Sequence, residues 1–385
     1  MRILSKNVEK MPRSGIRVIM DLAAEQKEAF HLELGEPGFS TPRHIQEAAV
    51  QAMKDGFTKY TPNPGFLSLR EIILRKVRGE NRVKAELDQI GVTPGSMFAL
   101  ASALMAVVEA GDEVLIPDPG WPNYYMQAIV MGFKPIFYRL HEESGFEPIV
   151  REIEPLIGPR TRAIVVNSPS NPTGAVHSQE TVADVLDLAV RRDIYIISDE
   201  VYEKIIFTGS HFSPATLDPN ERVIGIYGLS KTYAMTGWRI GYYVAPRDIA
   251  PEMHKLTEPF VACASAISQK AAEAALSGPQ ECVEEMVRAY RERRDLVTET
   301  LAREGFEFFT PQGAFYMLVR IDETGVDSYA FAKELVQKTG VAVAPGSTFG
   351  PSAAPYVRIS FCAKSEEIEE GLKRFCRFYR EKCRL

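Results

Sequence analysis

The sequence predicts an α/β protein with a mostly parallel sheet and two domains. Short runs rich in β-branched residues alternate with helical patterns through the middle of the chain, which is typical of this fold class. Several of these runs are apolar on both faces, as strands buried between two layers of helices are. The length of 385 residues suits about two domains.

The candidate strands and helices of the sheet region occupy the middle of the chain. Helical stretches separate the strands, and the stretch at 179–191 is one example. We place a large domain at residues 45–285 around this sheet. The six candidate strands are 113–117, 134–138, 162–167, 194–198, 223–227 and 239–244.

The C-terminal part has a different pattern, which predicts a smaller α+β domain. A long amphipathic stretch at 265–304 is followed by a helix at 328–338 and a final C-terminal helix. Short strands are expected at 341–344 and 356–361. We combine residues 286–385 with the N-terminal arm, residues 1–44, as the small domain.

Composition excludes several classes of function. A net charge of −6 with interspersed signs argues against a nucleic-acid partner. The five cysteines are scattered, without disulfide or metal-ligand spacing, so we expect a reducing compartment and no metal. The charged N-terminus does not resemble a signal peptide, and the apolar run 97–110 is too short to span a bilayer. We therefore expect a cytoplasmic protein without a membrane partner.

Polar side chains follow three of the predicted strands. Asn167 ends one strand, Asp199 follows another, and Lys231 comes shortly after a third. In open α/β sheets, ligands bind beyond the carboxyl ends of the strands, so these side chains are expected to share a crevice. The spacings of phosphate-loop, zinc-protease, serine-hydrolase and penicillin-binding motifs do not occur around them.

Several motifs in a fixed order point to a family. Residues 230–239, SKTYAMTGWR, have the pattern S-K-x(5)-G-x-R, and NSPSNPTG (167–174) and SDEVYEKI (198–205) precede them in the expected order. The chain from ELGEPGFSTP (33–42) to YVRIS (356–360) resembles the class I and II aminotransferases, which are pyridoxal-phosphate enzymes of fold type I. This resemblance implies a seven-stranded sheet, pyridoxal 5'-phosphate as cofactor, and a homodimer.

The resemblance assigns the chemical core to four residues. Lys231 would hold the aldehyde of the cofactor and later carry the α-proton of the substrate. Asp199 would pair with the protonated pyridine nitrogen, which compensates a carboxylate that is expensive to bury. Tyr202 and Asn171 match the residues that share the ring oxygen.

Further residues would bind the rest of the cofactor. Gly95 and Ser96 open an apolar helix whose free N–H groups attract an anion, and Ser230 and Arg239 supply a hydroxyl and a cation. Trp121 resembles the aromatic residue that stacks on the pyridine ring, with Tyr124 as a second candidate. Tyr60 matches a tyrosine that reaches the phosphate of the neighbouring subunit, so the active sites would be shared across the dimer.

The substrate contacts follow from the same resemblance. Arg358 lies mid-strand among apolar residues and suits a bidentate grip on the α-carboxylate. Gly35 would let the backbone approach the substrate, and Asn167 would assist the carboxylate or orient the ring. Ile16 offers an apolar lid, and Arg17 a mobile cation.

The donor is open on sequence alone. Met97 stands where one aspartate-preferring branch has a lysine, and a thioether cannot pair with a carboxylate. We expect broad use of apolar or aromatic donors, with Met97 either lining the site or turned into the core. The alternatives are strict aspartate specificity, a lyase of the same fold, and a regulator that joins an aminotransferase-like domain to a DNA-binding domain. We do not find a segment in this sequence that resembles such a DNA-binding domain.

Overall fold

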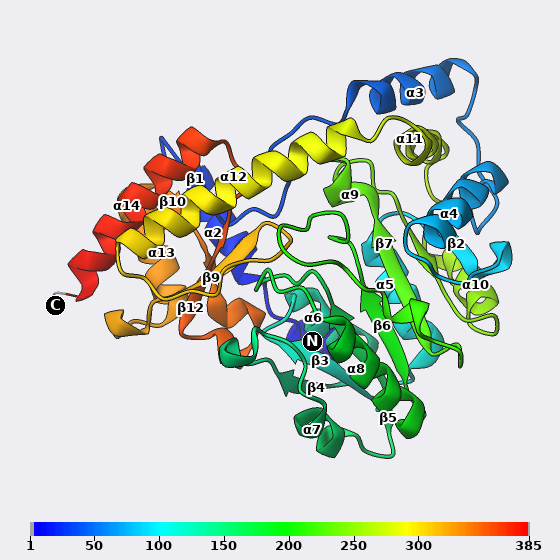
Figure 1. Cartoon of the computed structure of the whole chain (residues 1–385), viewed down its shortest axis with the longest axis horizontal. Coiled ribbons are helices and arrows are strands. Elements are labelled where there is room, and N and C mark those ends of the chain that lie inside the picture. The colour runs from blue at the N-terminus through cyan, green and yellow to red at the C-terminus, as the bar shows by residue number, and fades with distance from the viewer. Residues whose placement is uncertain (1–3, 384–385) are drawn as a thin grey trace.

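A seven-stranded sheet forms the centre of the computed structural model, which describes residues 4–383 (Figure 1). The strand order is β2-β8-β7-β6-β5-β3-β4. Only β8 runs antiparallel to its neighbours, so the predicted mostly parallel sheet is confirmed. The strands are β2 (Ile90–Thr93), β3 (Glu113–Asp118), β4 (Lys134–Arg139), β5 (Thr161–Asn167), β6 (Tyr195–Asp199), β7 (Val223–Gly228) and β8 (Gly241–Val244).

All six predicted strands are present, with two differences. The four-residue strand β2 was not predicted, because its sequence, IGVT, is too short to show a pattern. Strand β8 begins at Gly241 rather than at 239, because Arg239 has a left-handed backbone with φ 51° that cannot continue a strand.

Helices cover both faces of the sheet, and the strands alternate between them. Ala163 and Val165 of β5 share a core with α5, whereas Ile164 and Val166 pack on the side of α8. Both layers are apolar, which explains why the strands read as continuous apolar runs. The helices of this region are α3 (Arg43–Lys54), α4 (Leu67–Gly79), α5 (Ser96–Val107), α6 (Pro122–Met131), α7 (Val150–Ile153), α8 (Gln179–Arg192), α9 (Leu229–Thr232), α10 (Ala250–Val261) and α11 (Ala266–Ser277).

The C-terminal part forms a second α/β layer with segments of the N-terminal arm (Figure 1). A three-stranded antiparallel sheet has the order β11-β12-β9, and β1 pairs in parallel with β10. The elements are α1 (Lys6–Lys10), α2 (Gly15–Ala24), β1 (Phe30–His31), α12 (Glu281–Arg303), β9 (Tyr316–Arg320), α13 (Ser328–Thr339), β10 (Val341–Ala342), β11 (Ala344–Pro345), β12 (Tyr356–Ser360) and α14 (Ser365–Cys383).

One hydrophobic core joins the two ends of the chain. Ile19 and Leu32 of the arm are in the same buried cluster as Phe331, Leu335 and Phe375 of the C-terminal helices. This arrangement agrees with grouping the arm and the C-terminal part. The domain boundaries themselves stay a prediction.

Two C-terminal segments that the sequence presented as continuous are divided in the structure. The stretch 265–304 is two helices, because Pro279 lacks an N–H and disfavours helical geometry at Gly278 before it. The expected strand 341–344 is divided between β10 and β11, which belong to different sheets. Within residues 4–383, no helix has the length and apolar character needed to cross a membrane.

Candidate active site

The carboxyl ends of β5, β6 and β7 bring the predicted polar residues together. Asn167 and Asp199 are register partners on neighbouring parallel strands, and β7 leads directly into α9, which carries Lys231. These groups line a pocket of about 720 Å³, which lies within the range of about 300–1,000 Å³ typical of small-ligand sites. The predicted residues on its wall are Ile16, Gly35, Ser96, Met97, Trp121, Asn167, Asn171, Asp199, Tyr202, Ser230, Lys231, Arg239 and Arg358.

Lys231 lines this pocket with a partly buried side chain. Its Nζ donates a hydrogen bond of 2.6 Å to the backbone oxygen of Gly35. Burial lowers the pKa of Lys231 below its ordinary value, although Cys362 and Glu36 oppose the effect. A larger share of neutral amine at neutral pH is what a nucleophile requires.

Asp199 is a buried carboxylate whose side chain is held by two donors. Tyr124 donates its hydroxyl to Oδ2 at 2.6 Å, and the backbone N–H of Val201 reaches Oδ1 at 3.4 Å. Burial raises the pKa of Asp199 to about 6, while the bond from Tyr124 works in the opposite direction. Whether Tyr124 also supports the ring of the cofactor stays a prediction. Trp121 meets Tyr124 edge to face, with ring centroids 5.6 Å apart.

Asn167 connects two segments of the pocket wall rather than leaving its amide free. Its Nδ2 donates to the backbone oxygen of Asp199 at 2.9 Å, and its Oδ1 accepts the backbone N–H of Asn171 at 2.8 Å. Both amide atoms therefore serve to orient the neighbouring residues. The role of Asn167 in binding a substrate stays a prediction.

The N-terminus of α5 forms the cationic end of the pocket. Gly95 has φ 85°, and a Cβ at this position would lie 2.5 Å from Nη2 of Arg239. A Cβ on Gly241 would lie 2.6 Å from the backbone nitrogen of Ser96. The absence of side chains at both glycines thus keeps Arg239 and the first N–H groups of α5 close together. This combination of a fixed cation and free N–H groups suits an anion.

Arg358 is buried in the middle of β12, on the opposite wall. Its Nη1 donates to Oδ1 of Asn171 at 2.9 Å, and its Nη2 donates to the backbone oxygen of Glu33. The guanidinium carbon lies 4.2 Å from the ring centroid of Tyr316. Burial lowers the pKa of Arg358, yet an arginine remains charged at neutral pH. The buried Nε has no hydrogen-bond partner within residues 4–383.

Tyr316 is a pocket residue that the sequence analysis missed. Its hydroxyl forms a hydrogen bond of 2.9 Å with the hydroxyl of Tyr202. A Cβ on Gly35 would collide with the same hydroxyl, so the glycine is needed for this close approach. The sequence offered only a mostly apolar segment around it, AFYMLVRI, whose pairing with β12 could not be known beforehand.

The wall beside α2 and α6 is apolar and rich in methionine. Met97 lines the pocket, and Gln127 donates to its Sδ at 3.2 Å, so the possibility that Met97 turns into the core is excluded. Ile16, Met20 and Met126 line the same side. Tyr60 does not line this pocket: its side chain is 89% exposed on the loop between α3 and α4.

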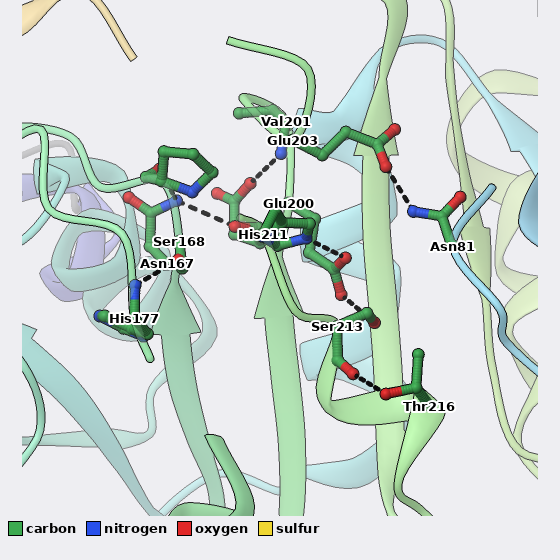
Figure 2. Close-up of polar contacts among 12 residues, drawn as sticks. Asn81, Asn167, Ser168, His177, Glu200, Val201, Glu203, His211, Ser213 and Thr216 are labelled. Carbon is green, nitrogen blue, oxygen red and sulfur yellow. Dashed lines mark hydrogen bonds and ion pairs between the residues drawn. The ribbon is translucent and has the colours of Figure 1, made fainter. Parts of the chain in front are cut away.

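A buried polar network supports the segment that follows Asp199. Glu200 accepts hydrogen bonds from Ser213 at 2.7 Å and pairs with His211 at 2.8 Å, as Figure 2 shows. Glu203 pairs with Lys76 of α4 and accepts a hydrogen bond from Asn81. These contacts fix the turn between Asp199 and Tyr202 from the side opposite the pocket.

Comparisons with known proteins agree with this geometry. The family model "Aminotransferase class I and II" matches residues 27–375. The chain belongs to this family. It is 38% identical to aromatic-amino-acid aminotransferase 2 of Thermococcus litoralis and 39% identical to the aspartate aminotransferase of Pyrococcus abyssi. Both alignments cover 98% of this chain and 99% of the relative.

The structure is also similar to solved aminotransferases. The aspartate aminotransferase of Thermus thermophilus with maleate superposes with a TM-score of 0.94 at 37% identity, over 98% of this chain and all of the other. The predicted aminotransferase family and its fold are therefore confirmed. The individual roles of the site residues are not tested by these comparisons and remain proposals.

Proposed function

We propose that this aminotransferase uses pyridoxal 5'-phosphate to move an amino group from an amino acid to a 2-oxo acid, and that it accepts apolar and aromatic donors. The observation that carries the proposal is the convergence of Lys231, Asp199, an anion cradle and Arg358 on one pocket. These are four different chemical demands of one cofactor and its substrate.

The residues present fit the cofactor at each of its functional groups. Lys231 suits the aldehyde, because it lines the pocket and its pKa is lowered. Asp199 suits the ring nitrogen, because a cationic partner would compensate its burial. The phosphate fits the N-terminus of α5, where a Cβ on Gly95 would occupy the cradle beside Arg239. When bound, pyridoxal phosphate supplies an electron sink for the carbanion that forms as the α-proton leaves.

The chain's own residues would then do the following work. The Nζ of Lys231 would take the proton from the substrate's Cα and deliver it to the carbon of the cofactor's aldehyde group. Asp199 keeps a proton on the ring nitrogen by opposing charge. Arg358 holds the α-carboxylate, with its guanidinium oriented by Asn171. Tyr202, positioned by the hydroxyl of Tyr316, completes the wall at the ring oxygen.

We also infer a homodimer with shared sites. Tyr60 is almost fully exposed and outside the pocket of its own chain, which supports donation to a neighbouring subunit. In the same way, we propose a cytoplasmic enzyme and the division into domains at residues 45–285 and 1–44 with 286–385. The scattered free cysteines support the reducing compartment.

The donor range is supported by the methionine-rich wall and by the two relatives. An aromatic-amino-acid aminotransferase and an aspartate aminotransferase are similar to this chain at nearly equal identity. The deciding experiment is kcat/KM for aspartate, phenylalanine, leucine and alanine, with 2-oxoglutarate as acceptor. We expect phenylalanine and leucine to be used. A preference for aspartate above about 100-fold would contradict a broad range.

Product analysis separates transfer from elimination. A transferase converts each donor into its own 2-oxo acid and forms one molecule of glutamate for each molecule consumed. A lyase of the same fold would release fragments of the donor without forming glutamate. That second result would overturn the proposed reaction while leaving the cofactor site intact.

A further inference from the structure

Two loops that are far apart in the sequence meet behind the wall of the active-site pocket. The first is the loop 118–121, which follows β3 and ends at Trp121. The second is the loop 346–353, which leads toward β12 and Arg358. Trp121 and Arg358 both line the pocket. In the proposed reaction Trp121 supports the cofactor ring and Arg358 holds the α-carboxylate, so the separation of these loops matters for the substrate.

Asp118 makes the main contact between the two loops. Its Oδ1 accepts the hydroxyl of Ser352 at 2.7 Å and the backbone N–H of Ser352 at 3.1 Å, and its Oδ2 lies 3.2 Å from the same nitrogen. Within residues 4–383, Ser352 supplies all the hydrogen bonds that this carboxylate accepts. Burial raises the pKa of Asp118, while the hydrogen bonds from Ser352 work in the opposite direction. A buried carboxylate with a single partner depends on that partner.

The backbones of both loops permit this close approach. The N–H of Gly120 donates to the backbone oxygen of Phe349 at 2.8 Å. Gly350 has φ 127°, and a Cβ at this position would lie 2.1 Å from Oδ1 of Asp118. A side chain at position 350 would therefore displace the carboxylate from Ser352.

Each side of the contact leads directly to a pocket residue. Phe349, which accepts the bond from Gly120, lies against Arg358, whose guanidinium carbon is 4.8 Å from the Phe349 ring centroid. Trp121 follows Gly120 in the chain. Beside the contact, the loops line a second cavity of about 410 Å³, with Gly120 and Trp121 on one side and residues 347–351 on the other. Because this cavity reduces side-chain packing between the loops, the hydrogen bonds carry more of their support.

We propose that Asp118 and Ser352 are positioning residues, which hold the wall at Trp121 and the wall at Arg358 at the separation that the reaction needs. This inference rests on the proposed function. An amino acid is held at both ends only when the ring that receives its amino group and the guanidinium that binds its carboxylate keep a fixed distance. A displacement of about 1 Å in such a set of groups can cost about 100-fold in rate.

The test is Asp118→Ala in the cofactor-loaded enzyme, measured as single-turnover reactions with two amines. One is the donor with the highest kcat/KM among aspartate, phenylalanine, leucine and alanine. The other is O-methylhydroxylamine, which also reacts with the aldehyde of the cofactor but has no carboxylate. The second-order rate constant for the donor should fall about 10- to 100-fold, and that for O-methylhydroxylamine should stay within about threefold of wild type. An equal fall with both amines, or no fall with the donor, would overturn the assignment.

A double-variant cycle tests whether Asp118 acts through Ser352. Ser352→Ala removes only the bond of 2.7 Å and should lower the rate constant for the donor about 3- to 10-fold. Asp118→Asn keeps an acceptor oxygen and should lose less than Asp118→Ala. The double variant should be no slower than Asp118→Ala, because one contact can be lost only once. Losses that multiply would overturn the assignment. If Asp118→Ala does not fold, an unchanged rate constant in Ser352→Ala would overturn it as well.

Asp112→Ala is the matched control. Asp112 precedes the opposite end of β3, where it accepts the backbone N–H of Glu109 at 3.2 Å and pairs with Arg162. Its replacement also deletes a carboxylate and its contacts, and should leave the rate constant for the donor within about twofold of wild type. A fall like that of Asp118→Ala would show that any weakening around β3 slows the reaction, which overturns the assignment. Wild-type enzyme that converts none of the four donors refutes the proposed function itself.

Discussion

The burial of Asp199 lowers the stability of the fold but suits the function that we propose for this side chain. Its carboxylate is 4% exposed, and burial raises its pKa from an ordinary 3.8 to about 6. Tyr124 offsets part of that cost with a hydrogen bond of 2.6 Å. A cationic ring nitrogen in the pocket would provide the remaining compensation.

Replacing Asp199 should therefore raise the stability of the protein and lower its activity. Between pH 4 and pH 6, Asp199 of the cofactor-free protein is protonated in the folded state and ionised in the unfolded state. Stability from this group is present below pH 4 and is lost as the pH rises through about 6. At pH 8, the free energy of unfolding of Asp199→Asn, measured in urea, should thus exceed that of wild type by up to about 3 kcal/mol. The gain should vanish near pH 4.

The same variant should lose most of its turnover when loaded with cofactor. A neutral amide cannot keep the ring nitrogen protonated, and a loss of more than about 100-fold in kcat is expected. The check is steady-state kinetics under saturating cofactor, with absorbance spectra to show that the cofactor is bound. Turnover comparable with wild type would mean that Asp199 is structural.

Tyr124→Phe removes the hydrogen bond but keeps the ring against Trp121. The pKa of Asp199 should then rise further, because burial is less opposed. We expect the acidic limb of the pH profile of kcat/KM to move to higher pH, with less effect on kcat/KM well above pH 8. A profile with an unchanged acidic limb would show that Tyr124 does not influence Asp199.

At the scale of elements, the sequence predicted what depends on local pattern. The ends of β5, β6 and β7 were located to within a residue, so the convergence of Asn167, Asp199 and Lys231 could be anticipated. Contacts between distant segments could not. Tyr316 joins Tyr202 only because β9 lies beside β12, and Tyr124 of α6 joins Asp199 at the end of β6.

The N-terminus of α5 allows a direct test of the anion cradle. Gly95→Ala would strain a backbone with φ 85° and bring a methyl group against Arg239. We expect the affinity for pyridoxal phosphate, measured by titration of the cofactor-free protein, to fall at least about 10-fold. Gly111→Ala is the control, since it has φ 92° but open space around its Cβ. Equal losses in both variants would indicate a general folding defect.

The ion pair between Lys76 of α4 and Glu203 links an outer helix to the turn after Asp199. Burial opposes ionisation of Glu203, yet Lys76 and Asn81 lower its pKa below the ordinary value. Lys76→Met should cost about 3–5 kcal/mol in urea unfolding at pH 8, because it leaves a buried carboxylate without its cation. The double variant Lys76→Met with Glu203→Gln should recover much of this loss. No recovery would show that packing, rather than charge, sets the cost.

At the scale of the whole molecule, the account requires a partner subunit. Tyr60→Phe should weaken cofactor binding, and Lys231→Ala should abolish transfer. A mixed dimer of these variants, isolated with two affinity tags, contains one site with both native residues. It should therefore show about half the wild-type turnover per dimer. Inactive mixed dimers, or an active monomer at nanomolar concentration, would contradict shared sites.

The central claim is that Lys231 carries the cofactor in this pocket. Borohydride reduction of the cofactor-loaded protein, followed by peptide mapping, tests it most directly. The account predicts a stable phosphopyridoxyl label on the peptide that contains Lys231, and loss of that label in Lys231→Ala. A label on another lysine of the wild-type chain, or one that persists in Lys231→Ala, would contradict the account.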